Sequence, residues 1–180
     1  MIHAVTDGSG LPDHIEKKII SISPVVDAVC IREKQLSAKE FSIKVIRLMN
    51  HGVPPEKLIL HSSPELADFF PVLGVHFTEF DERLSAFKHA HPDKLAGRSV
   101  HSVSSAQKAE ADGADYLYFG HVFATKSKTG LKERGLDALH EAAAAVSVPV
   151  IAIGGIHHGN MTAVRQAGAS GAAMISAFFN

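Results

Sequence analysis

Eight short apolar segments recur along the chain and alternate with segments of helical spacing. The short segments cover residues 2–6, 25–31, 57–60, 73–77, 95–100, 115–119, 148–153 and 171–175. The segments with apolar positions three and four apart cover residues 13–22, 38–50, 81–90, 104–112, 136–146 and 160–167. This spacing predicts buried strands alternating with amphipathic helices. Because a helix between two strands makes a parallel crossover, the chain is expected to be an α/β protein with a parallel sheet.

The number of strands favours one architecture. Eight strand–helix units predict a closed (β/α)₈ TIM barrel rather than an open doubly wound sheet. No low-complexity stretch or linker interrupts the pattern, so we expect a single domain over residues 1–180. Barrels of this kind typically take roughly 250 residues, and here only Ala177 to Asn180 follow the eighth segment. We therefore expect the last closing helix to be missing.

Charge and composition narrow the kinds of partner. The net charge of −1 and the isoelectric point near 6.9 provide no long-range field that would attract nucleic acid or an anionic membrane. No apolar run approaches the roughly 20 residues that cross a bilayer, so we expect a cytoplasmic protein with a small-molecule ligand, leaving homo-oligomerisation open. Cys30 is the only cysteine, which excludes an internal disulfide and a multi-thiolate metal site.

In TIM barrels the catalytic face is built by the loops that leave the C-terminal strand ends, and phosphate commonly binds near the seventh and eighth of them. The seventh exit carries Gly154 and Gly155, whose backbone N–H groups can approach an anion closely. The eighth exit carries Ile175 and Ser176, which add a hydroxyl and a possible helix start. Together these four residues predict a phosphate site.

Three other exits carry polar side chains. At the sixth, His121 follows an apolar strand and precedes Thr125, Ser127 and Lys128. Histidine can donate and accept protons near neutral pH, so His121 is a candidate acid/base. No metal site is expected, because paired histidines elsewhere lack further ligands at a useful spacing.

The second exit places Arg32 where a guanidinium can bind a carboxylate in a bidentate manner, although pairing with Glu33 is an equal alternative. At the fifth exit, strand alternation sends Ser99 and His101 to one face and Arg98 to the other. Ser99 and His101 are therefore candidate pocket residues. Four exits converge on one small anionic ligand.

The stretches "CIREK", "GRSVHS", "DYLYFGHVFATKSKTG", "IAIGGI" and "MISAFF" resemble the thiamine phosphate synthase superfamily, and within it TenI-type thiazole tautomerases. The resemblance implies a (β/α)₈ barrel that isomerises a carboxythiazole phosphate to its aromatic tautomer, without a cofactor. By this resemblance His121 is the catalytic acid/base. It also implies that the substrate contacts Arg32, Ser99, Thr125, Lys128, Gly154, Gly155, Ile175 and Ser176. Our own hypothesis is that Arg32 binds the substrate carboxylate.

Two alternatives remain. The synthase branch joins the thiazole phosphate to a pyrimidine diphosphate with magnesium; it usually has proline where this chain has His121. Its third exit reads Asn-Asp-Arg, whereas this chain has His61, Ser62 and Ser63. Asp81 matches its second metal-binding carboxylate. The other alternative is a regulatory or ligand-binding barrel without catalysis. The features favour a tautomerase, an isomerase of thiamine biosynthesis.

Overall fold

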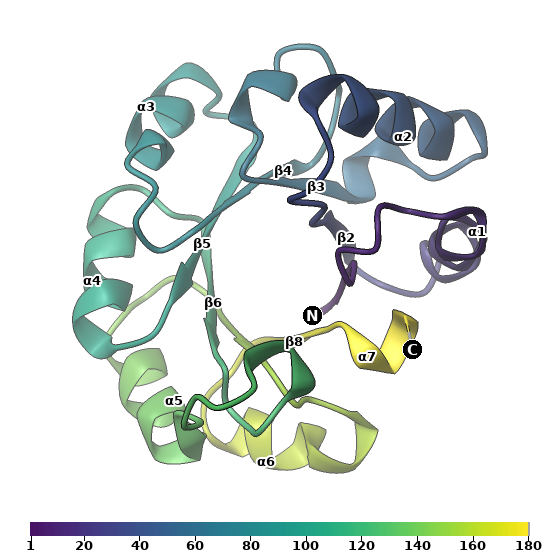
Figure 1. Ribbon diagram of the computed structural model, residues 1–180. Coiled ribbons are helices and arrows are strands. Elements are labelled where there is room, and N and C mark those ends of the chain that lie inside the picture. The colour runs from purple at the N-terminus through teal and green to yellow at the C-terminus, as the bar shows by residue number, and fades with distance from the viewer. Residues whose placement is uncertain (180) are drawn as a thin grey trace.

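The computed structural model describes residues 1–179, except for the side chain of Lys126. Eight parallel strands close into a barrel in which each strand pairs with its neighbours in sequence and β1 pairs with β8. Figure 1 shows the helices as a ring around this barrel. The strands are β1 (Ile2–Val5), β2 (Ala28–Ile31), β3 (Leu58–His61), β4 (Gly74–Phe77), β5 (Leu95–Val100), β6 (Tyr116–Gly120), β7 (Val150–Ile153) and β8 (Gly171–Met174). The prediction of a TIM barrel is confirmed.

Within residues 1–179 the helices follow the predicted order. They are α1 (Asp13–Ile22), α2 (Ala38–Asn50), α3 (Arg83–Ala90), α4 (Val103–Ala111), α5 (Gly135–Ala144), α6 (Met161–Gln166) and α7 (Ser176–Phe179). Short 3₁₀ turns are η1 (Pro55–Lys57), η2 (Pro64–Leu66), η3 (Lys126–Lys128) and η4 (His158–Asn160). None of these helices is long and apolar enough to cross a bilayer.

Two connections depart from a regular barrel. The one between β3 and β4 holds only the turn η2, and β8 is followed by the four-residue helix α7 in place of a full closing helix. Figure 1 places α7 beside α1. Helix α3 begins at Arg83 rather than at residue 81, because the Asp81 carboxylate precedes the helix and accepts from the Arg83 N–H. Helix α4 begins after Ser102, which forms a capping box with Ser105.

Strand alternation divides the apolar residues into two layers. One set faces the surrounding helices and forms the larger core, with residues such as Leu60, Val75 and Leu117. The other set fills the barrel interior: Val5, Ala28, Cys30, Ile59, Tyr116, Tyr118, Ile151 and Ala173. Gly97 makes room for this filling, since a Cβ there would overlap the ring of Tyr116. The main cavity lies at the C-terminal end of this packed interior.

Candidate active site

A cavity of about 490 Å³ lies at the C-terminal strand ends. All nine residues predicted for the site line it: Arg32, Ser99, His121, Thr125, Lys128, Gly154, Gly155, Ile175 and Ser176. They come from five strand exits that are distant in sequence. The closed barrel brings these exits together because the carboxyl ends of parallel strands meet on one face.

The floor of the cavity is a hydrogen-bonded polar network inside the barrel. The two ring nitrogens of His76 hydrogen-bond to the Tyr116 hydroxyl at 3.2 Å and to the Ser99 hydroxyl at 2.9 Å. The His76 ring also stacks on Tyr118, with 4.0 Å between ring centroids. Below them His3 Nδ1 lies 2.8 Å from the Tyr118 hydroxyl. Ser99 is therefore held by His76, whose ring is itself fixed by the Tyr116 hydroxyl and by stacking on Tyr118.

Burial keeps the floor uncharged. It lowers the pKa of His3 to about 4 and the pKa of His76 well below its ordinary value. At the cavity wall, burial and the positive charges of Arg32 and Lys34 lower the pKa of His61 to about 4. A neutral imidazole has one N–H and one lone pair, so His76 donates to one of its two hydroxyl partners and accepts from the other.

Cations gather at the rim. Arg32 and Lys34 leave the end of β2, and Lys128 reaches the cavity from the loop after β6. The pKa of Lys34 is lowered chiefly by the charge of Arg32, then by burial and by the charge of Lys128. The cavity also holds two carboxylates, Asp7 and Glu79. The rim is suited to a multiply charged anion, because clustered cations need anionic partners to offset their repulsion.

The paired glycines at the β7 exit allow the loop after β6 to close against β7. Gly154 and Gly155 have φ values of +95° and +67°, a region that favours glycine. A Cβ at Gly154 would overlap the Cβ of His121, and one at Gly155 would lie 2.6 Å from the Ala124 carbonyl. The Phe123 N–H donates to the Gly154 carbonyl at 3.1 Å. Close backbone approach explains both glycines, and it leaves their backbone facing the cavity.

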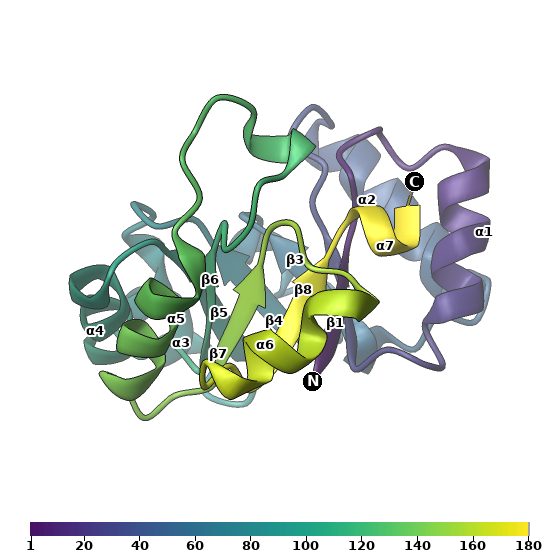
Figure 2. The ribbon, with the colours of Figure 1, turned by 90° about the horizontal axis from the view of Figure 1, so that it is seen from below.

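His121 lies at the base of this loop. The Arg134 N–H donates to the His121 carbonyl at 2.9 Å, and His121 Nε2 lies 3.2 Å from the Leu131 carbonyl. The imidazole therefore contacts the segment of the loop that returns towards α5, and His121 also lines the cavity. Figure 2 shows the loop projecting from the end of the barrel that carries the strand exits.

Strand alternation at β5 places its polar residues as predicted. Ser99 and His101 line the cavity. Arg98 points to the outside of the strand, where it binds the carboxylate of Asp112 and donates to the Asp81 carbonyl at 2.6 Å. The fifth exit thus contributes hydroxyl and imidazole groups to the cavity, and it uses its guanidinium for packing against α4.

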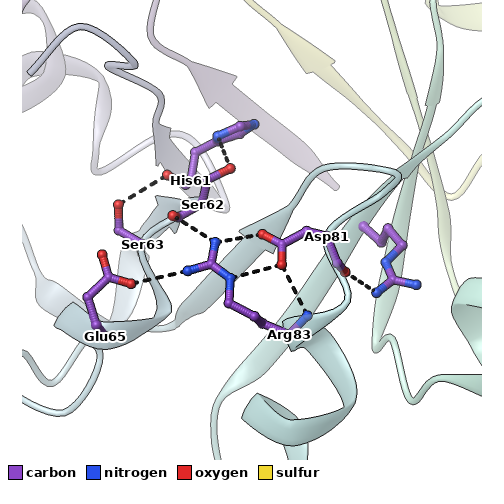
Figure 3. Close-up of polar contacts among 7 residues, drawn as sticks. His61, Ser62, Ser63, Glu65, Asp81 and Arg83 are labelled. Carbon is purple, nitrogen blue, oxygen red and sulfur yellow. Dashed lines mark hydrogen bonds and ion pairs between the residues drawn. The ribbon is translucent and has the colours of Figure 1, made fainter.

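The third and fourth exits carry a closed ion-pair network (Figure 3). The Asp81 carboxylate accepts from three Arg83 groups: the backbone N–H at 3.1 Å, Nε at 2.9 Å and Nη2 at 2.7 Å. Arg83 also reaches Glu65 at 3.5 Å and the Ser62 carbonyl at 3.4 Å. These hydrogen bonds lower the pKa of Asp81 and keep its charge paired.

This arrangement does not fit the magnesium that the synthase branch uses. Magnesium is usually held by one or two carboxylates together with phosphate oxygens. Ser62 supplies no carboxylate, and both Asp81 oxygens are bound by Arg83. In the part of the chain that the structure describes, no three His, Cys, Asp or Glu side chains are grouped to hold a metal ion.

Several cavity residues were not predicted. His76 and Tyr118 lie within strands that were considered only as apolar core, and Glu79 and Phe80 leave the fourth exit, for which no site residue was proposed. The rule that placed Ser99 in the cavity also applies to His76, two residues after inward-facing Gly74. Lys34 could have been found too, since it lies two residues after Arg32.

A closed parallel barrel with a polar cavity at its C-terminal strand ends is the arrangement found in TIM-barrel enzymes. The chain belongs to the thiamine monophosphate synthase (TMP-TENI) family, whose profile matches residues 3–178. The membership predicted from the sequence motifs is confirmed, and it places the chain in a family of thiamine-biosynthesis enzymes.

Individual relatives carry synthase names. The thiamine-phosphate synthase of Desulfitobacterium hafniense (strain Y51) is 40% identical over 156 residues, 83% of this chain and 74% of that protein. The thiamine-phosphate synthase of Clostridium tetani is 33% identical over 183 residues, 97% of this chain and 86% of that protein. The structure of thiamine phosphate pyrophosphorylase from Pyrococcus furiosus superposes with a TM-score of 0.78 at 27% identity, covering 97% of this chain and 85% of that one.

These relatives correct the expected activity. The chain was predicted to be a thiazole tautomerase, an isomerase, on the strength of His121 in the place of a proline. Relatives aligned over most of the chain are named synthases, so the tautomerase assignment is wrong. Physically, one imidazole was given too much weight, because His121 also holds the loop through the Leu131 carbonyl.

Proposed function

We propose that the chain is a thiamine-phosphate synthase, a transferase that joins a thiazole phosphate to a pyrimidine diphosphate. One observation supports the proposal: a single cavity is lined by two separate regions that are each suited to an anion. Three cations lie at the β2 exit and the β6 loop, and the glycine-rich backbone of β7 lies with Ser176 at the neighbouring exits. A diphosphate and a phosphate need two such regions, and three clustered cations suit the higher charge of a diphosphate better than a single carboxylate.

The reaction assigns each region a task. The thiazole nitrogen forms a bond to the methylene carbon of the pyrimidine, and the carbon–oxygen bond to the diphosphate breaks with its electron pair leaving on the diphosphate. Arg32, Lys34 and Lys128 stabilise the charge that develops on that leaving group. The backbone at Gly154, Gly155 and the β8 exit, Ile175 and Ser176, binds the thiazole phosphate.

The remaining predicted residues fit this scheme without proton transfer. Thr125 extends the anion region on the β6 loop, and Ser99 offers a hydroxyl at the cavity floor. Forming the carbon–nitrogen bond does not require a proton to leave the thiazole nitrogen. We therefore assign His121 to positioning the loop through the Leu131 carbonyl. Arg32 binds phosphate oxygens in this scheme and not a carboxylate.

The test is to mix the purified protein with both precursors and to follow thiamine phosphate and released diphosphate together. Equal amounts of the two products are expected. Arg32→Gln should lower their rate of formation, and Lys39→Gln, which removes an exposed cation on α2 outside the cavity, should not. Binding of both precursors without any product would refute the transferase.

A further inference from the structure

The acids nearest the cavity differ in whether they are available to a ligand. Asp81, which lies at the fourth exit, is not among the residues that line the cavity, and its carboxylate is bound by Arg83 through Nε and Nη2. Figure 3 shows the Arg83 guanidinium between Asp81 and Glu65, where it also contacts the Ser62 carbonyl. A cation from the protein therefore already fills the position beside Asp81 where a metal ion would have to bind.

The carboxylates that line the cavity are fewer than the cations that line it. Asp7 and Glu79 line it, together with Arg32, Lys34 and Lys128. His101 Nε2 lies 4.0 Å from the Glu79 carboxylate. A diphosphate in this cavity would contact positive side chains directly and would be repelled by the two carboxylates. A bridging metal ion would need those same carboxylates as ligands.

We infer that the cavity binds diphosphate directly through Arg32, Lys34 and Lys128, and that no divalent cation bridges the ligand to protein carboxylates. This inference rests on the proposed function, because it concerns the diphosphate end of the proposed substrate. It differs from the resemblance to synthases, which implies magnesium. The Asp81–Arg83 pair is the structural reason for the difference, since it replaces a metal-binding carboxylate with an internally neutralised ion pair.

Glu79→Gln separates the two ways of binding by the sign of its effect. If cations bind diphosphate directly, removing the Glu79 charge removes repulsion, and affinity for diphosphate should rise by about two- to fivefold. If a metal ion bridges the ligand to Glu79, the same change removes a metal ligand, and affinity should fall. Glu141→Gln removes an exposed carboxylate on α5 outside the cavity and should change nothing.

The measurement is calorimetric titration with inorganic diphosphate, in buffer with a chelator and in buffer with magnesium. We expect binding in chelator within about threefold of that in magnesium, or tighter. We expect Arg32→Gln and Lys34→Gln to weaken it by about tenfold or more in both buffers. Thermal unfolding of each variant checks that it is folded.

Three results would overturn the inference: binding that appears only with magnesium, weaker binding by Glu79→Gln, or no binding in either buffer. Because the titration involves no turnover, its result is separate from the test of the transferase. Product formation together with magnesium-dependent diphosphate binding would retain the proposed function and reject direct binding. Binding of diphosphate without metal, together with no product, would retain direct binding and reject the proposed function.

Discussion

The floor and the rim of the cavity belong to one barrel, and they use polar groups in opposite ways. The floor holds His3, His76 and two tyrosines in full burial, where hydrogen bonds replace water and charge is suppressed. The rim holds Arg32 and its neighbouring cations in partial contact with solvent, where charge persists. Depth in the barrel thus separates neutral, hydrogen-bonded polar groups from charged ones.

This difference has a physical origin. A buried charge without a partner is costly, so the interior retains the neutral form of each histidine. At the rim, water and salt weaken repulsion between like charges, so several cations can share a small region. Substitutions at the floor should therefore change stability, and substitutions at the rim should change ligand binding. The predictions below test this division, beginning with the largest expected effect.

His76→Leu should destabilise the fold most. It removes one hydrogen-bond partner from each of two hydroxyls, on Tyr116 and Ser99, and it removes the ring that stacks on Tyr118. We expect the free energy of unfolding to fall by about 3 kcal/mol or more, because each buried unpaired polar group costs about 1–3 kcal/mol. Urea unfolding measures this change.

The control for that experiment is His89→Leu, which changes an exposed histidine on α3. It should shift the free energy of unfolding by less than about 0.5 kcal/mol. His76→Gln, which can keep one hydrogen bond, should lie between the two. Equal stability of His76→Leu and the parent protein would show that the floor network does not stabilise the barrel.

Arg32→Gln should have the largest effect on activity. Loss of a charged contact to the leaving group is expected to lower kcat/KM for thiamine phosphate formation by about 100-fold, equivalent to about 2.7 kcal/mol. The unfolding temperature should stay within about 2 °C of the parent, since the guanidinium is half-buried at the rim. A large loss of stability with unchanged kcat/KM would reverse the assignment of the rim.

Acidification should lower the free energy of unfolding, because the floor of the cavity contains buried, neutral His3. In the folded protein the pKa of His3 is lowered to about 4 by burial, and in the unfolded chain it is near 6.5. Between these values the unfolded chain binds a proton that the folded protein does not, so stability falls as the pH decreases from about 6.5 towards 4. For His3 the expected loss is about 2 kcal/mol at pH 5.

Urea unfolding of the parent and of His3→Gln at pH 7 and pH 5 isolates this contribution. The variant has no proton to bind at this position, so it should lose less stability than the parent between the two pH values. An identical loss in both proteins would mean that proton binding by His3 does not differ between the folded and unfolded states, and that other groups cause the loss of stability.

Lys128→Gln should have the smallest effect, because Lys128 is exposed at the rim. We expect diphosphate affinity to fall by about three- to fivefold at low salt, and by less at high salt where screening weakens the contact. Lys132→Gln, on the same loop outside the cavity lining, is the matched control. An effect of Lys128→Gln that does not depend on salt would place this side chain deeper than the rim.

Much of the fold was predictable from local pattern. Helices α1 and α2 have the predicted bounds, and each of the eight strands overlaps its predicted segment. The site was predictable in part, because the barrel rule identifies strand exits before any contact is known. The sequence missed Glu79 and Phe80, since a charged residue and an aromatic residue in a turn carry no periodic signal. No helical segment was predicted between β3 and β4, and only the turn η2 lies there.

The amino-acid sequence by itself determined the barrel, the position of the cavity and nine of the residues that line it, because period and alternation are properties of neighbouring residues. The tertiary structure alone decided which polar groups keep their charge. His3 meets Tyr118 across 115 positions, and Arg83 binds the carbonyl of Ser62 across 21 positions. Burial and ion pairing arise from such distant contacts, and these contacts neutralise the floor and leave the rim charged.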